Sequence, residues 1–136
     1  MDLFSRRVIG WSLGENKTAE LTRSAIRKAL KHRKVKPGLI FHTDRGPEYE
    51  AYLIQNELKR AGIQSSMNRP KYVTDNAHME SFFHSMKTEV IRGNVFKSDA
   101  QLRATLGGYI NKYYNATRMH SCIDYCSPIE YEAIAA

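Results

Sequence analysis

Two carboxylates, Asp44 and Glu80, have the positions in this sequence that best suit chemistry. Asp44 follows the apolar run 39–43 and is followed at once by Gly46 and Pro47, which predicts a short buried strand ending at this aspartate. Open α/β sheets bind their ligands at the carboxyl ends of strands. Glu80 lies on a predicted helix, and the two carboxylates together offer hard oxygen ligands for Mg²⁺ or Mn²⁺. Two such ions can activate a water or hydroxyl nucleophile and stabilise the leaving oxygen.

The helix that carries Glu80, predicted over about 76–91, places two more polar side chains beside it. His84 and Lys87 follow at i+4 and i+7, so the three side chains form one stripe along the border of an apolar face. That apolar face is expected to consist of Met79, Phe83, Met86 and Val90, and to be widened by Phe82. Lys87 suits a DNA phosphate as a point charge. Taken alone, the stripe also fits an ordinary polar flank with a Glu80–His84 pair.

Composition favours one folded domain with an anionic partner. The 136 residues are 42% hydrophobic and 26% charged, and the formal net charge of +7 points first to nucleic acid. No apolar run approaches the roughly 18–20 residues that span a bilayer, and the start lacks a signal-peptide pattern, so a cytoplasmic location is expected. Cys122, Cys126 and His120 offer only three clustered zinc ligands, and reduced structural thiols are the preferred interpretation.

Strands that alternate with helices predict an α/β sheet protein. Residues 3–13 suit a strand, and Thr18 caps a helix that runs to about His32. One side of this helix is basic, and basic residues continue past the end of the helix. This basic face fits a solvated surface as well as a DNA contact. It comprises Arg23, Arg27, Lys28, Lys31, Arg33, Lys34 and Lys36. Further along, we expect a helix at 48–61 stopped by Gly62, a strand at 63–67, a polar loop at 68–75, and helices at 76–91, 98–115 and after Pro128.

Four motifs resemble the catalytic core of the retroviral-integrase-like transposases of bacterial insertion sequences. They are DLFSRRVIGWSL (2–13), HTDRGPEY (42–49), DNAHMESFFHSMKTE (75–89) and YYNATRMHSCIDYCSPIEYE (113–132), in the family's order and over most of the chain. The 35 residues between Asp44 and Glu80 (80 − 44 − 1) match the family's spacing for its second and third acidic residues. Lys87 stands where the family keeps a basic residue that contacts DNA.

The resemblance implies a ribonuclease-H-like fold, a mixed sheet flanked by helices, as a single core domain over residues 1–136. It also implies metal-dependent phosphoryl transfer on DNA, in which water cuts at the element's ends and the freed 3′-hydroxyl attacks a target strand. Asp44 and Glu80 are then catalytic and hold Mg²⁺ or Mn²⁺. DNA contacts are expected from Lys87, His84, Arg45, Arg69 and Lys71. His42 either lines the site or serves packing and hydrogen bonding, and the block from Tyr113 is expected to be structural.

The family's first acidic residue lies on a first strand that would precede residue 1. Asp2 matches a hairpin aspartate of the family, and its expected role is to turn the chain beside Ser5 and Arg6. Without the first strand, residues 2–13 are expected to pair directly with 39–43, to borrow a strand from another chain, or to pack poorly. Exposed strand edges favour dimerisation or strand exchange.

Three functions therefore remain open at the level of sequence. The chain is the core of an enzyme that cuts and joins DNA, a truncated remnant that binds DNA or co-assembles with full-length transposase, or a metal-dependent nuclease of the same fold. A homodimer or higher oligomer is the expected assembly.

Overall fold

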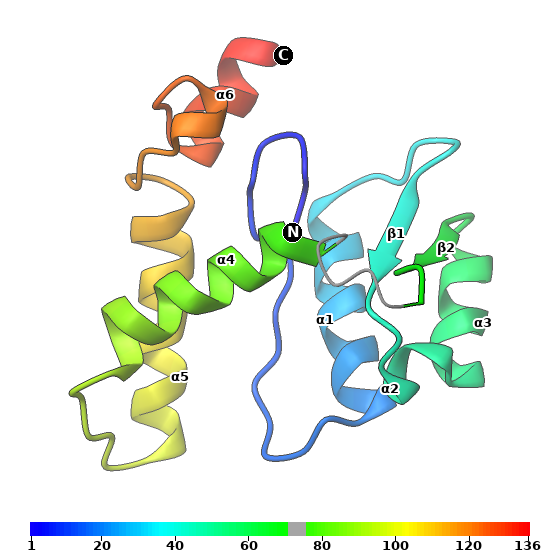
Figure 1. The fold of residues 1–136 in the computed structure, drawn as a ribbon, viewed down its shortest axis with the longest axis horizontal. Coiled ribbons are helices and arrows are strands. Elements are labelled where there is room, and N and C mark those ends of the chain that lie inside the picture. The colour runs from blue at the N-terminus through cyan, green and yellow to red at the C-terminus, as the bar shows by residue number, and fades with distance from the viewer. Residues whose placement is uncertain (71–75) are drawn as a thin grey trace. The chain divides into compact units, whose positions relative to one another are not determined.

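The computed structural model describes residues 1–70 and 76–136, which form two compact units (Figure 1). Unit 1 consists of Met1–Val8 together with His78–Ala136, and unit 2 consists of Ile9–Ala77. Lys71, one of the expected DNA contacts, lies outside the described residues. No helix among the described residues is long and apolar enough to cross a membrane.

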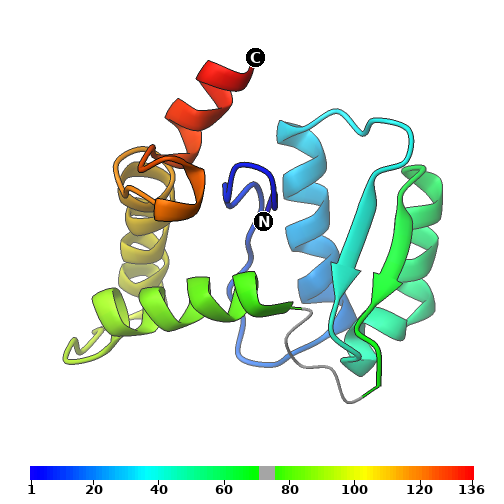
Figure 2. The ribbon, with the colours of Figure 1, turned by 45° about the horizontal axis from the view of Figure 1, so that its top comes forward.

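Unit 2 is built from two parallel strands and the helices that precede them. Its elements are α1 (Ala19–His32), β1 (Ile40–Thr43), α2 (Pro47–Glu50), α3 (Tyr52–Arg60) and β2 (Gln64–Met67). The strands pair in register from Ile40 opposite Gln64 to Thr43 opposite Met67, and their arrows run side by side in Figures 1 and 2. The core of this unit lies between α1 and α3 and consists of Ile26, Ile54 and Leu58, with Ala19, Leu30, Phe41 and Ile63 packed around it.

Local signals account for the helix ends in unit 2. The hydroxyl of Thr18 accepts a hydrogen bond from the amide of Leu21 at 3.2 Å, which confirms the predicted cap of α1. Gly62 adopts a φ of 71° just beyond α3 and ends it, as predicted, because a left-handed conformation favours glycine. The predicted helix at 48–61 is interrupted at Ala51, whose ψ of 137° is extended, so α2 and α3 are separate helices.

The strand predicted at 3–13 is wrong. A turn occupies 3–5, where the amide of Phe4 donates to Asp2 Oδ1 at 2.9 Å, and this confirms the turning role of Asp2. Beyond it the chain is extended but joins no sheet, since the described residues form only the two-stranded ladder of β1 and β2. Extended backbone still needs partners, and side chains provide them: Asn115 bonds both backbone groups of Val8, and Lys28 donates to the Trp11 carbonyl at 3.1 Å.

Gly10 explains how this extended segment fits against α1. A Cβ at Gly10 would lie 2.5 Å from the carbonyl oxygen of Ala25 and 2.6 Å from the amide nitrogen of Ala29, both in the helix backbone. No larger residue can make this approach without moving the helix or the segment. At Gly10, the segment therefore packs its backbone directly onto α1.

The prediction that 39–43 is a buried strand is only partly correct. The strand forms, but Leu39 is 45% exposed and Ile40 is 59% exposed, and only Thr43 is buried. Among the described residues β1 has a ladder partner along one edge alone, and a fully buried parallel strand would need cover on both faces of its sheet.

The main regular elements of unit 1 are helices. It contains α4 (Ala77–Met86, whose first residue belongs to unit 2), α5 (Asp99–Gly108) and α6 (Pro128–Ala135), and α4 and α5 each continue into a π-helical turn, at Lys87–Ile91 and Tyr109–Tyr114. These elements confirm the three helices predicted for this part of the chain. Ser98 caps α5, and Ser127 with Glu130 forms a capping box at the start of α6.

The buried face of α4 differs from the predicted one. Phe82 is 5% exposed and its ring meets Tyr114 edge-on with centroids 4.9 Å apart, whereas Phe83 is 45% exposed. Met79, Phe82, Met86 and Val90 succeed one another by three, four and four residues, which is also a helical stripe, so the apolar pattern did not distinguish the two adjacent phenylalanines. The expectation that Phe83 faces the core was wrong.

Candidate active site

Asp44 lies at the carboxyl end of β1, as the sequence predicts. Its side-chain Oδ1 accepts a hydrogen bond from the amide of Gly46 at 3.0 Å, and Pro47 then begins α2. This short turn, with an aspartate bonding the backbone two residues ahead, holds the carboxylate at the strand end. The side chain is exposed, so its other oxygen faces solvent and can bind a ligand.

A small network joins the ends of the two strands around Asp44. His42 lies 3.0 Å from the Ser66 hydroxyl through Nδ1 and 2.8 Å from Asn68 Oδ1 through Nε2. Asn68 is 8% exposed, and its backbone amide donates a hydrogen bond to the carbonyl oxygen of Thr43 at 2.9 Å. Because Oδ1 of an asparagine only accepts, Nε2 of His42 carries the proton in this bond, and in the neutral ring Nδ1 accepts from Ser66. Of the two roles considered for His42, hydrogen bonding is the one that the structure supports.

Arg45 also contributes to this network. Its Nε donates to the carbonyl oxygen of Asn68 at 2.8 Å, which ties the residue after Asp44 to the end of β2. The rest of the exposed guanidinium can still reach a phosphate. Neither Ser66 nor Asn68 was singled out from the sequence, because each acts through a partner more than twenty residues away and carries no motif of its own.

Glu80 lies in the first turn of α4 and is exposed. A negative charge is favourable there because the backbone amides at a helix start carry partial positive charge. His84 and Lys87 are exposed as well, which agrees with the predicted polar stripe, and the neighbouring Phe83 is 45% exposed. Within residues 76–136 no ion pair joins Glu80 to His84, so the alternative reading of the stripe as a bonded Glu–His pair is not supported.

The two predicted catalytic carboxylates are thus carried by different units, Asp44 by unit 2 and Glu80 by unit 1. Their convergence on one metal ion stays a prediction. Among residues 1–70 and 76–136 no three His, Cys, Asp or Glu side chains form a group that could hold a metal ion.

A polar network in unit 1 anchors the helix that carries Glu80. Glu89 accepts hydrogen bonds from Tyr109 at 2.8 Å and from Arg118 at 3.0 Å. Partial burial acts to raise the pKa of Glu89, but the bonds from Arg118 and Tyr109 outweigh it and hold that pKa below its usual range. Burial also raises the pKa of Tyr114 to about 12. Glu89 is therefore a structural anion that fixes the end of the α4 segment to the following helices.

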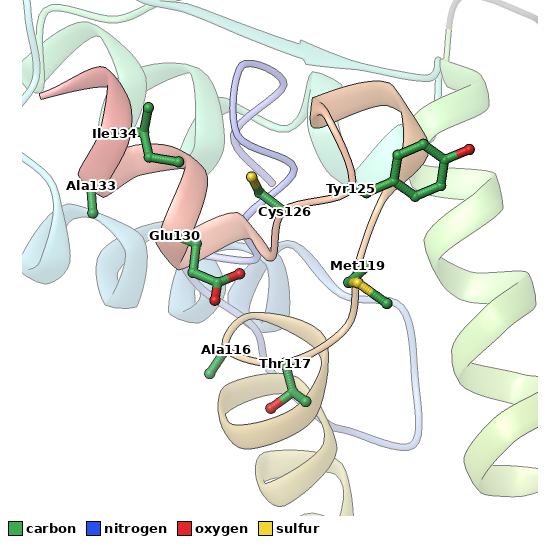
Figure 3. A pocket seen from close by; sticks show the side chains of 8 residues that line it. All are labelled: Ala116, Thr117, Met119, Tyr125, Cys126, Glu130, Ala133 and Ile134. Carbon is green, nitrogen blue, oxygen red and sulfur yellow. The ribbon is translucent and has the colours of Figure 1, made fainter.

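A hollow of about 630 Å³ lies near the C-terminal end of unit 1 (Figure 3). It is lined by Ala116, Thr117, Met119, Tyr125, Cys126, Glu130, Ala133 and Ile134. Its one carboxylate, Glu130, already accepts a hydrogen bond from the amide of Ser127 at 2.8 Å in the capping box. The lining of the hollow is mostly apolar, and it contains no second carboxylate beside Glu130.

Comparisons with known proteins agree with the resemblance seen in the sequence. Two family models, each described as an integrase core domain, match residues 1–72 and 80–134. The transposase for insertion sequence element IS904 of Lactococcus lactis is 40% identical over 132 residues, which are 97% of this chain and 52% of that protein. Transposase InsF for insertion sequence IS3A of Escherichia coli is 44% identical over 132 residues, covering 97% and 46% respectively.

A solved structure supports the fold. The catalytic core domain of BIV integrase superposes with a TM-score of 0.63 at 22% identity, covering 90% of this chain and 75% of that one. The chain spans about half the length of the curated relatives that it matches. The common fold is the ribonuclease-H-like arrangement predicted above. This protein belongs to the integrase core domain family, and its relatives include insertion-sequence transposases.

Proposed function

We propose that this chain provides the catalytic core of a DNA transposase, with Asp44 and Glu80 as two of its metal-binding carboxylates. The observation that carries the proposal is the position of Asp44, an exposed carboxylate held at the end of a parallel strand by its own turn. Membership of the integrase core domain family and relatives that are named transposases support it. Glu80, in the first turn of α4, follows at the family's spacing.

The residues present fit a hard divalent cation. Asp44 commits one oxygen to Gly46, and Glu80 makes no hydrogen bond or ion pair among the described residues, so both keep oxygen lone pairs for a metal. When bound, Mg²⁺ or Mn²⁺ would activate the attacking oxygen and stabilise the leaving one. The network of His42, Ser66 and Asn68 keeps the strand end in place, so that Asp44 needs little reorganisation to bind.

The proposed reaction is two successive displacements at phosphorus in DNA. In the first, water forms a P–O bond and the DNA 3′-oxygen leaves with a proton as a free hydroxyl. In the second, that hydroxyl attacks a phosphodiester of the target strand, and the target's own 3′-oxygen leaves. Phosphate oxygens are expected to contact Lys87, His84, Arg45, Arg69 and Lys71. The proposed partners are element ends and target DNA, with the chain acting as an oligomer or together with full-length transposase.

Nicking of supercoiled DNA in the presence of Mn²⁺ tests this assignment. We expect activity from the chain and its loss in both Asp44→Asn and Glu80→Gln, which are close in shape but poor metal ligands. Both variants should keep the far-ultraviolet circular dichroism and melting temperature of the unmodified chain. Nicking that survives both substitutions would falsify the site. DNA binding without any nicking by the unmodified chain would favour the alternative, a DNA-binding or co-assembling module.

A further inference from the structure

The charges of unit 2 are separated between its two ends. Because β1 and β2 are parallel and follow α1 and α3 respectively, the carboxyl ends of both helices lie at the amino ends of the strands (Figures 1 and 2). Asp44 lies at the opposite end, with the acidic residues of α2 and the first turn of α1. The end away from Asp44, called here the basic end, carries Lys31, Arg33, Lys34, Lys36, Lys59 and Arg60.

Acidic residues are sparse in the two sequence segments that carry this charge. The sequence contains no Asp or Glu between Glu20 and Asp44, or between Glu57 and Asp75. The lysines at 31, 34, 36 and 59 and the arginine at 60 are all exposed. The carboxylate nearest to Lys59 and Arg60 in sequence is that of Glu57, and it already binds Arg23 and Arg27. Such a concentration of exposed positive charge favours the binding of an anion.

Part of the basic face of α1 is used for packing within unit 2. Arg23 and Arg27 donate to the carboxylate of Glu57 at 2.7 Å and 2.9 Å, so these two cations serve the packing of α1 against α3. Among the described residues no carboxylate pairs with Lys34 or Lys36. Favourable interaction with the helix dipole accounts for cations in the last turn of a helix, but Lys34 and Lys36 lie beyond the end of α1.

We propose that the basic end binds the phosphate backbone of duplex DNA, at a stretch separate from the phosphodiester that reacts at Asp44. The 14 residues of α1 span roughly 21 Å, so the two ends lie far enough apart to contact different segments. Lysines act as compact point charges suited to sequence-independent phosphate contact. The inference rests on the proposed function for its choice of DNA over other polyanions.

Salt-dependent DNA binding by the full chain tests the basic end. Binding of a labelled random-sequence duplex is measured by fluorescence anisotropy in EDTA, between about 50 and 200 mM salt. Each lost phosphate contact should lower the slope of log K against log salt by about 0.9, so Lys34→Gln with Lys36→Gln should lower it by about 2. At 0.1 M salt this corresponds to roughly 60-fold weaker binding, because each contact contributes about eightfold.

A matched control removes the same charge elsewhere. Lys17 precedes α1, at the end that carries Asp44, and Lys97 lies in unit 1; both are exposed. Lys17→Gln with Lys97→Gln should leave the slope unchanged and affinity within about twofold of the unmodified chain. Both double variants should keep the unmodified melting temperature.

The outcomes separate this inference from the proposed function. Unchanged DNA binding in the variant at positions 34 and 36, or an equal loss in the control, would overturn the basic end as a DNA site. If the variant at positions 34 and 36 binds anionic lipid vesicles more weakly but binds DNA unchanged, the basic end would be assigned to a membrane surface and the DNA proposal would be overturned. Failure of the unmodified chain to bind DNA even at low salt would instead reject both proposals, whereas loss of metal-dependent nicking in Asp44→Asn concerns the catalytic site alone.

Discussion

Asn115 is predicted to be the most important polar side chain for the stability of unit 1. It is 4% exposed and bonds both backbone groups of Val8: its Oδ1 accepts from the Val8 amide at 3.0 Å, and its Nδ2 donates to the Val8 carbonyl at 2.9 Å. This is the pair of bonds that a neighbouring strand would supply. Asn115→Ala leaves both groups buried without partners, which costs about 1–3 kcal/mol each and therefore about 2–6 kcal/mol together.

Urea unfolding followed by far-ultraviolet circular dichroism measures this loss. Hydrogen exchange adds a local readout, since the Val8 amide should be protected in the unmodified chain and exposed in the variant. Asn111, which is exposed in the same helical turn, provides the control, and Asn111→Ala should change the free energy of unfolding by less than about 0.5 kcal/mol. An Asn115→Ala protein with unmodified stability and a protected Val8 amide would refute the reasoning.

Two further predictions concern unit 2. Gly10→Ala should destabilise it by about 1–3 kcal/mol, because the new methyl group would lie 2.5 Å from the Ala25 carbonyl oxygen; the single tryptophan, next in sequence, reports the change by fluorescence. Hydrogen bonds from Arg27 and Arg23 lower the pKa of Glu57. The stability that the ionised Glu57 carboxylate contributes is therefore present above the ordinary carboxyl pKa, and it is lost as pH falls through the lowered pKa of the folded state. Glu57→Gln should therefore lower the urea midpoint at neutral pH and match the unmodified chain in acid; an equal gap at both pH values would contradict this.

The elements with local signals could be predicted from the sequence. Thr18, Gly62 and Pro128 mark helix ends through bonds and dihedral angles within a few residues, and all three act as predicted. Asp44 was placed at a strand end by the same kind of evidence, because a turn follows it at once. In each case the physical cause lies within the same short segment as the signal.

The errors have long-range causes. Residues 3–13 have the composition of a strand, but strand formation depends on a neighbouring strand, and here Asn115, 107 residues from Val8, satisfies the backbone instead. Likewise, two residues of the basic face of α1, Arg23 and Arg27, serve the packing of that helix, because Glu57 binds both from another helix. A single sequence holds no signal that identifies such partners, since each is one ordinary polar residue.

The position of Asp44 depends on hydrogen bonds more than on packing. Burial restrains Thr43, the last residue of β1, but not Asp44 itself, which is exposed, and the strand's other edge has no partner among the described residues. The constraint comes instead from the ladder with β2, from the bridge that His42 makes to Ser66 and Asn68, and from the bond between Asp44 and Gly46. A carboxylate fixed in this way stays open to solvent, metal and DNA while its backbone is restrained. That combination suits the metal-binding role proposed for Asp44 at the strand end.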